Sequence, residues 1–240
     1  MNAKMKVLSL ALVGLCGYAG SALAVCPAGP TVAQGGAWSN AVQFQGTAVI
    51  ATPGFVTTEC RLDSTINAGA GGAATASVED DTPAAEARYR ASFVVKLDGL
   101  ASPTITTGSG IFSAISDATG GGINVGIFGS GSQWFVSYIV ADANEPSGFY
   151  AGSSALAAGE NHVEFDLQIN ATGSFTLWVN NNVEGTPTIL PHAVNNAAVL
   201  GVDTAFLGLA APTSAFVGTY AGIAAGFDQF DSRRQTFIGY

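Results

Sequence analysis

The sequence predicts an all-β fold built from two antiparallel sheets, a β-sandwich, on the basis of three observations. From residue 88 onward, apolar and polar residues alternate with a period of two, which is the pattern of half-buried strands. The segments between these runs consist almost entirely of Gly, Ser, Asn, Thr and Pro, as in DATGGG and NEPSG. No window of the sequence shows a convincing helical period. Many short strands at fairly regular spacing are typical of a sandwich.

The first 24 residues have the features of a secretory signal peptide. Lys4 and Lys6 give a positive start, VLSLALVGLCG forms the apolar centre, and SALA ending at Ala24 is the small-residue pattern that signal peptidase cleaves. The apolar run is too short, and too interrupted by Gly, to cross a bilayer as a stable helix. We therefore expect export to an extracellular or periplasmic location, with no transmembrane segment in the mature chain.

The rest of the chain, residues 25–240, is expected to form a single domain, because all-β domains commonly reach this size. Within it we place N-terminal strands and a disulfide at 25–75 and the main body of the sandwich at 76–240.

Charged residues are few and mostly acidic. The chain has 8 Lys and Arg against 17 Asp and Glu, and signal cleavage would remove two of the lysines. Such a chain cannot replace the counterions of nucleic-acid phosphates, so a nucleic-acid partner is disfavoured. An anionic membrane surface is disfavoured for the same reason.

The cysteines agree with export. Cys16 would leave with the signal peptide, so Cys26 and Cys60 remain as an even pair in an oxidising compartment. A disulfide between them would contribute roughly 3 to 4 kcal/mol by loop closure. A metal pair or a redox site fits less well, because there is no C-x-x-C motif and no nearby histidine.

Individual strands follow from local patterns. Every second residue is apolar in RYRASFVVKLD (88–98), HVEFDLQIN (162–170) and SFTLWVN (174–180). The turn NATG between the last two predicts a hairpin, with Gly173 able to take a positive φ. GINVGIF (122–128) and QWFVSYIV (133–140) are expected to be central strands covered on both faces. The uncharged stretch 205–227 predicts two buried strands joined by a turn at APTS, and NAAVLG (196–201) predicts one short helical turn.

Two segments carry a resemblance to a known superfamily. The hairpin ENHVEFDLQINATGSFTLWVNNNVEG and the closing AGFDQFDSRR resemble the concanavalin A-like and laminin G-like jelly rolls. Asn161 stands where that pattern usually has Trp, and 180–182 replace its Asp-Gly turn. Within the superfamily, VEDDTPAAEARYR and the FDSRR tail (an FxSRR pattern) are similar to a set of exported Gram-negative bacterial proteins. The resemblance implies a jelly-roll fold and an exported location, and it implies no activity.

One strand carries a row of residues that look catalytic. His162, Glu164, Asp166 and Gln168 point to the same side, about 7 Å apart along the strand. Two carboxylates so placed could divide the acid and nucleophile roles at a glycosidic bond. Lichenase-type β-glucanases carry E-x-D-x-E, whereas this chain has Gln168 in the last position and therefore lacks the proton donor. We interpret the row mainly as the solvated face of an amphipathic strand.

Three further residues are candidates for binding. Trp178 alternates opposite Phe175, Leu177 and Val179, so its indole points away from that core layer and could stack on a sugar ring. In jelly rolls of this kind an aspartate of the closing strand often binds calcium, which implies Asp228, with Asp80 and Asp81 as further candidate ligands. His192, beside Pro191, is expected to be a solvent-exposed loop residue without catalytic partners.

The stretch EDDTPAAEARYR (79–90) puts six charges into twelve residues. Because Arg88 and Arg90 alternate with the apolar face of their strand, we interpret these charges as its wet edge. The preceding acids could pair with Arg233 and Arg234, at about 0 to 1 kcal/mol for each exposed pair.

The leading functional hypothesis is a non-catalytic binding or surface-interaction module, not an enzyme, with a glycan or other cell-surface ligand. No cofactor is required, although a structural calcium ion is possible. The alternatives are a glycan-active hydrolase that uses Glu164 and Asp166, and a structural envelope or matrix protein without a small ligand.

Overall fold

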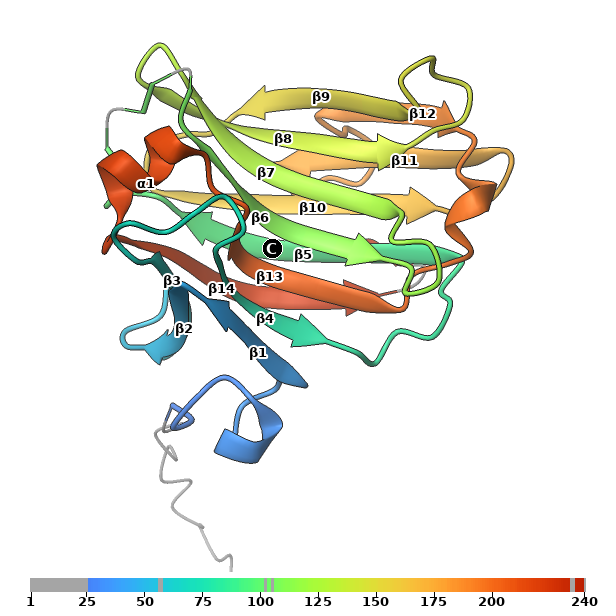
Figure 1. Cartoon of the computed structure of the whole chain (residues 1–240). Helices are drawn as coiled ribbons and strands as arrows, with labels where there is room; N and C mark the ends of the chain where they lie inside the picture. Colours follow the sequence, from blue (N-terminus) through green and yellow to red (C-terminus); the bar gives the residue numbers. More distant parts are fainter. Residues whose placement is uncertain (1–25, 56–57, 102, 105, 234–235, 240) are drawn as a thin grey trace, which may run out of the picture.

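The computed structural model describes residues 26–55, 58–101, 103–104, 106–233 and 236–239 (Figure 1). The proposed signal peptide therefore lies outside the described residues. In the part of the chain that is described, no helix is long and apolar enough to cross a membrane.

The described strands form two seven-stranded antiparallel sheets packed face to face. The first, here called the β6 sheet after its central strand, has the order β1 (Asn40–Phe44), β4 (Thr75–Asp80), β13 (Thr204–Ala210), β6 (Gly108–Ile115), β7 (Gly122–Ser130), β8 (Gln133–Ala141) and β9 (Phe149–Ala155). The second, the β5 sheet, has the order β12 (Ile189–Val194), β11 (Gly173–Val179), β10 (Glu160–Gln168), β5 (Arg88–Lys96), β14 (Ala224–Arg233), β3 (Arg61–Ile66) and β2 (Gly46–Ala51). The predicted all-β jelly-roll sandwich is confirmed.

Aromatic side chains fill the space between the sheets. The ring of Phe112, on the β6 sheet, lies 5.6 Å from Phe93 and 5.2 Å from Phe165 on the β5 sheet. Phe227 of β14 joins the same cluster through Phe93. The alternation predicted for β5, β10 and β11 is thus confirmed, because the apolar residue at every second position faces this core.

One sequence-based expectation for the β6 sheet and its neighbours was wrong, and a second was wrong in part. Strands β7 and β8 are covered on one face only: residues such as Ile139, 46% exposed, point outward. The stretch 205–227 contains the two predicted strand segments, in β13 and β14, but a helix, α1 (Ser214–Tyr220), and not a turn alone joins them. The Thr213 side chain caps this helix by accepting a hydrogen bond from the backbone N–H of Phe216, and Phe216 and Tyr220 pack against Trp134. The short 3-10 turn Ala197–Val199 confirms the predicted helical turn.

The N-terminal segment is tied to the β5 sheet. Cys26 and Cys60 form the predicted disulfide, with their Cα atoms 5.6 Å apart, and Cys60 directly precedes β3. A second short 3-10 turn, Val32–Gln34, lies between Cys26 and β1.

The predicted pairing of the acids at 79–81 with the C-terminal arginines is wrong for Arg233. The guanidinium of Arg233 binds Asp231 at 2.8 Å, and the carboxylate of Glu79 accepts a hydrogen bond from Asn40. Arg234 lies outside the described residues.

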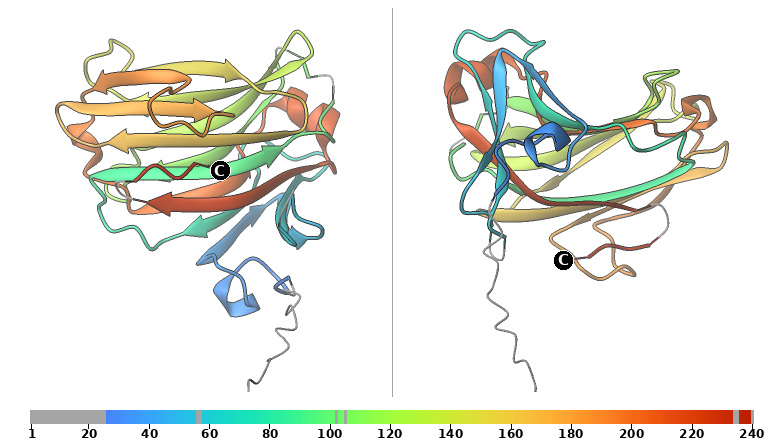
Figure 2. Two further views of the ribbon diagram at one scale, coloured as in Figure 1. Left: turned by 180° about the vertical axis from the view of Figure 1, so that it is seen from behind. Right: turned by 90° about the horizontal axis from the view of Figure 1, so that it is seen from below.

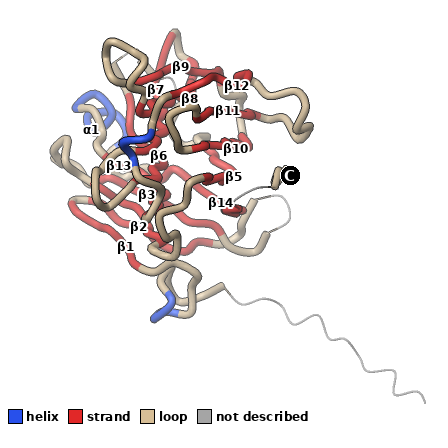
Figure 3. Tube along the Cα trace, turned by 90° about the vertical axis from the view of Figure 1, so that its right-hand side faces the viewer, coloured by secondary structure: helices blue, strands red, loops and turns tan. Residues whose placement is uncertain are grey.

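The end of the chain returns across the sandwich. After β14 the C-terminal segment lies on the outer face of the β5 sheet, in front of β5 and beside the loop that joins β11 to β12 (Figure 2). The view from the side places this end outside both strand layers (Figure 3). This position decides the environment of the residues described next.

Candidate functional site on the outer face of the β5 sheet

The described Lys and Arg side chains lie on one outer face of the molecule. All five Lys and Arg residues that the structure describes belong to β3, β5 or β14, at positions that alternate with core residues and therefore point outward. They are Arg61, Arg88, Arg90, Lys96 and Arg233. By contrast, strands β13, β6, β7, β8 and β9 contain no Asp, Glu, Lys or Arg. The outer face of the β5 sheet is therefore where a charged or hydroxyl-rich ligand would find partners.

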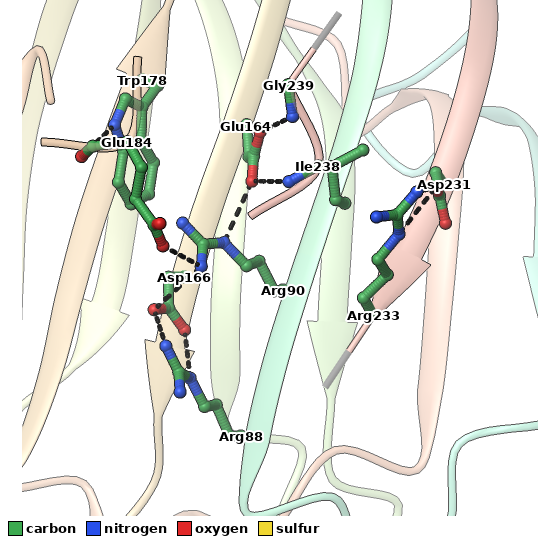
Figure 4. A network of polar contacts seen from close by, with 10 residues as sticks. All are labelled: Arg88, Arg90, Glu164, Asp166, Trp178, Glu184, Asp231, Arg233, Ile238 and Gly239. Atoms are coloured by element: carbon green, nitrogen blue, oxygen red, sulfur yellow. Dashed lines mark hydrogen bonds and ion pairs between the residues drawn. The ribbon is translucent and has the colours of Figure 1, made fainter. Parts of the chain in front are cut away.

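The centre of this face holds a network of ion pairs (Figure 4). Arg90 Nε donates to Glu164 Oε1 at 3.0 Å, and Arg90 Nη1 donates to Glu184 Oε1 at 3.0 Å. Arg88 binds Asp166 through two hydrogen bonds, of 2.9 and 2.6 Å. The contact with Asp166 raises the pKa of Arg88.

The interpretation of these residues as a solvated strand face was wrong. The side chains of Arg90 and Glu164 are only 1% and 0% exposed, and Asp166 is also buried. A charge is tolerated in such a position only when it is paired and hydrogen-bonded. In this arrangement both carboxylates of the proposed hydrolase pair, Glu164 and Asp166, are held by arginines.

The C-terminal segment buries the network. The backbone N–H groups of Ile238 and Gly239 donate to the two oxygens of Glu164, each at 2.9 Å (Figure 4). Gly239 has a φ of 66°, a left-handed conformation that favours glycine. These contacts join residues 74 and 75 positions apart in the chain, which is why no local pattern predicted them.

Trp178 lies on the outer face, as the alternation predicted, but the same segment covers it. The indole is 3% exposed, and its ring centroid lies 5.3 Å from that of Phe237. The Arg90 guanidinium carbon lies 4.8 Å from the indole ring and 5.0 Å from the Phe237 ring. The indole N–H donates to the backbone carbonyl of Glu184. Whether Trp178 binds a sugar stays a prediction.

His162, in the same row of β10, is 6% exposed. Burial lowers the pKa of its imidazole to about 4, so the ring is neutral at pH 7. Gln168, the last residue of the row, lies at the half-buried end of β10. The row is thus brought together on one strand as predicted, with its central members covered.

An open cavity of 310 Å³ lies at the other end of the same face. Its polar lining includes Arg61, Asp63, Lys96 and Glu160. Lys96 Nζ lies 3.5 Å from carboxylate oxygens of both Asp98 and Glu160, and Arg61 forms two hydrogen bonds with Asp63. Both cations also approach the ring of Phe55, at 5.9 and 5.5 Å.

Sequence reasoning did not single out this cavity. Its residues come from β3, β5, β10, β14 and the loops before β3 and after β5, so only the fold assembles them. One signal was available: Lys96 is the single lysine that remains after residue 24.

Among the described residues, the three predicted calcium ligands do not come together as one cluster of ligand atoms. The Asp228 carboxylate accepts hydrogen bonds from the backbone N–H groups of Phe55 and Gln229 and from the Thr58 hydroxyl. Asp80 and Asp228 line one cavity of 420 Å³, whereas Asp81 binds the Ser39 hydroxyl. Calcium binding at these residues stays a prediction.

A different cluster could also hold a metal ion, and here the expectation for His192 was wrong. His192 belongs to β12, and its ring stacks on Tyr150 with centroids 3.6 Å apart. Its imidazole and the carboxylates of Asp142 and Glu145 offer ligand atoms within 4.8 Å of one another. One imidazole and two carboxylates suit zinc or a similar transition metal.

Comparisons with known proteins identify the fold. No protein-family model matches the chain, and no curated protein sequence matches it. Among solved structures, an alginate lyase is 14% identical over 90% of this chain and 95% of its own, with a TM-score of 0.59. An endo-β-1,4-glucuronan lyase from the fungus Trichoderma reesei is 15% identical over 82% and 91%, with a TM-score of 0.56. A cellulose-induced protein is 13% identical over 82% and 89%, with a TM-score of 0.51.

These matches define the class of fold, a jelly-roll sandwich that polysaccharide lyases share with this chain. They overturn the expectation of a non-catalytic binding module, because that expectation rested on an analogy of fold and the matching folds include enzymes. The finer resemblance, to exported Gram-negative proteins with an FxSRR tail, stays a prediction.

Proposed function

We propose that this chain is an exported enzyme that cleaves a uronate-containing polysaccharide bound across the outer face of the β5 sheet. One observation carries the proposal: every Lys and Arg that the structure describes lies on this face, in a chain whose formal net charge is −9. A polyuronate carries a carboxylate on each sugar, and Arg and Lys are the side chains that bind carboxylates. The glucuronan and alginate lyases of the same fold support this substrate class.

The cavity beside Phe55 contains the groups that an elimination needs. In this reaction a base removes the proton from sugar C5, the C–H electron pair becomes a C4–C5 double bond, and the glycosidic oxygen leaves C4 with a proton. Arg61 can neutralise the sugar carboxylate, which makes the C5 proton more acidic. We assign Glu160 as the base and Lys96, 3.5 Å from it, as the donor of the proton to the leaving oxygen.

The hydrolase alternative, with Glu164 and Asp166 as the catalytic pair, is less well supported. Each carboxylate is bound to an arginine, and Glu164 accepts two further hydrogen bonds from the C-terminal segment. The oxygens of both carboxylates are thus already taken by donors within the chain, so neither is free to act on a glycosidic bond in this arrangement.

The experiment compares two products. The oxidised mature chain is incubated with alginate, with glucuronan and with cellulose as an uncharged control. Elimination produces new reducing ends together with the ultraviolet absorbance of an unsaturated uronate, whereas hydrolysis produces reducing ends alone. We expect both signals from a polyuronate and neither from cellulose. Folded protein that cleaves no polyuronate contradicts the proposal.

Variants then test the assigned roles. We expect Arg61→Gln, Lys96→Gln and Glu160→Gln each to lower the rate by roughly 100-fold or more, because each removes a group that acts on the transition state. Arg233→Gln is the matched control, since Arg233 lies on the same face outside the cavity. An equal loss in the control would show that overall charge, and not the cavity, determines the rate.

A further inference from the structure

The way the chain end covers Glu164 points to a second site on the same face. Glu164 belongs to the outward row of β10, yet it is fully buried, and the residues that bury it are the last described residues of the chain. Residues 236–239 follow β14 and belong to no strand, so they can leave this position without breaking a strand ladder. The contacts that they make therefore show which chemical groups this position accepts.

The first contact is a fork of two donors. The consecutive N–H groups of Ile238 and Gly239 give one hydrogen bond to each oxygen of the Glu164 carboxylate, both at 2.9 Å. Two adjacent hydroxyl groups of a pyranose offer the same pair of donors. Hydrogen bonds to an ionised carboxylate are stronger than those between neutral groups, so such a diol would bind well here.

The second contact is between two aromatic side chains. Phe237 packs on Trp178 with centroids 5.3 Å apart. Trp178 is the partner of Glu164 in the register of β10 and β11, so Phe237 covers an indole that lies beside this carboxylate. An aromatic face next to a hydrogen-bonding carboxylate suits a sugar ring, which has an apolar C–H face and a hydroxyl edge.

The third observation is an N–H donor of Arg90 to which the C-terminal segment gives no hydrogen-bond acceptor. Arg90 Nη2 is buried and has no hydrogen-bond partner among the described residues, although Nε and Nη1 of the same guanidinium are bonded. Buried donors are almost always paired, so this N–H indicates a missing acceptor. A sugar carboxylate supplies such an oxygen, and arginine is the residue that commonly binds carboxylates.

We propose that Glu164, Arg90 and Trp178 form a hexuronate-binding subsite that residues 236–239 occupy within the same chain. Adjacent hydroxyls of the sugar replace the N–H groups of Ile238 and Gly239, the sugar ring replaces Phe237, and its carboxylate binds Arg90. The polysaccharide enters by displacing the segment. The subsite rests on the proposed function, because the same polyuronate extends from it to the cavity at Lys96.

The test measures binding and not cleavage. A chain that ends at Arg233 is compared with the full chain by titration calorimetry with an alginate tetrasaccharide. Since the segment lowers the fraction of open sites, its removal should tighten binding by roughly tenfold or more. The peptide RQTFIGY, added separately, should bind the shortened chain and compete with the oligosaccharide. Glu164→Gln in the shortened chain should abolish the gain.

A full-length variant covers the case in which the shortened chain does not fold. Ile238→Pro removes one of the two N–H donors and should also tighten oligosaccharide binding, whereas Thr236→Ala, at an exposed position of the same segment, should not change it. Folded shortened or Ile238→Pro protein that binds the tetrasaccharide no better than the full chain overturns the subsite.

The two proposals fail in different ways. If the protein cleaves a polyuronate but the shortened chain binds the tetrasaccharide no better, the subsite proposal is wrong and the proposed enzyme activity stands. Tighter binding on shortening, with competition by the peptide but without any cleaved product, supports the subsite and contradicts the enzyme.

Discussion

Arg90 and Glu164 form an ion pair on the outer face of a sheet, with 3.0 Å between Nε and Oε1, and both side chains are almost completely buried. The pair is enclosed by Trp178 on the strand beside it and by Phe237 from the end of the chain. The neighbouring strands β5 and β10 therefore carry a buried ion pair on the outer face of their sheet.

Breaking this pair should destabilise the fold. Arg90→Met leaves Glu164 buried without its cation, and a buried ion pair that loses one partner typically costs about 3–5 kcal/mol. We expect this loss in the free energy of unfolding measured with urea. Arg233→Met, which removes a half-exposed pair with Asp231, should cost about 1 kcal/mol or less. Equal effects would show that Arg90 is not held as described.

The disulfide should raise the free energy of unfolding by restricting the unfolded chain. Cys26 and Cys60 are 34 positions apart, and closing a loop of this length restricts the unfolded chain. Replacing both cysteines by serine should lower the free energy of unfolding by roughly 3–4 kcal/mol. The measurement compares this variant with the oxidised wild type under non-reducing conditions. An unchanged value would mean that the bridge adds no net stability.

His162 should make stability fall as the solution becomes acidic. Its folded pKa, about 4, lies below the ordinary value of 6.5, so between these values the unfolded chain binds a proton that the folded chain does not. Stability from this group is therefore complete above pH 6.5 and is lost as the pH falls towards 4, by up to about 3 kcal/mol. The measurement is the difference in unfolding free energy between wild type and His162→Gln at pH 7 and at pH 4.5. A difference independent of pH contradicts the prediction.

Asp228 allows the calcium prediction to be separated from a purely structural role. If calcium binds there, it should raise the melting temperature of the wild type but not of Asp228→Asn, and a chelator should reverse the effect. Without calcium, Asp228→Asn should still lose about 1–3 kcal/mol, because Asn has one acceptor oxygen and cannot accept from the Phe55 and Gln229 N–H groups through separate oxygens as Asp228 does. If calcium does not change the melting temperature of the wild type, the calcium prediction is wrong and Asp228 has only its structural role.

Several features of the fold could be predicted because they depend on neighbours in sequence. Alternation in RYRASFVVKLD and HVEFDLQIN set which residues face the core, and the turn NATG set the hairpin between β10 and β11. The helix α1 was missed because it has seven residues and contains Gly218, and a helix this short depends on packing rather than on local propensity.

The site was harder to predict than the fold. Alternation correctly placed Trp178, Glu164 and Arg90 on one outer face, but it does not determine whether side chains on that face are exposed to solvent. The cover comes from residues 74 and 75 positions away, and His192 likewise meets Asp142 and Glu145 from a distant part of the chain.

The sequence by itself therefore determined the class of fold, the disulfide and the side of each strand on which a residue lies, because period, composition and cysteine count are properties of the chain. Only the tertiary structure decided which charges are buried, which cations meet in the cavity and what covers Trp178. Burial and electrostatic environment depend on all the atoms around a group, and most of those atoms come from distant parts of the chain.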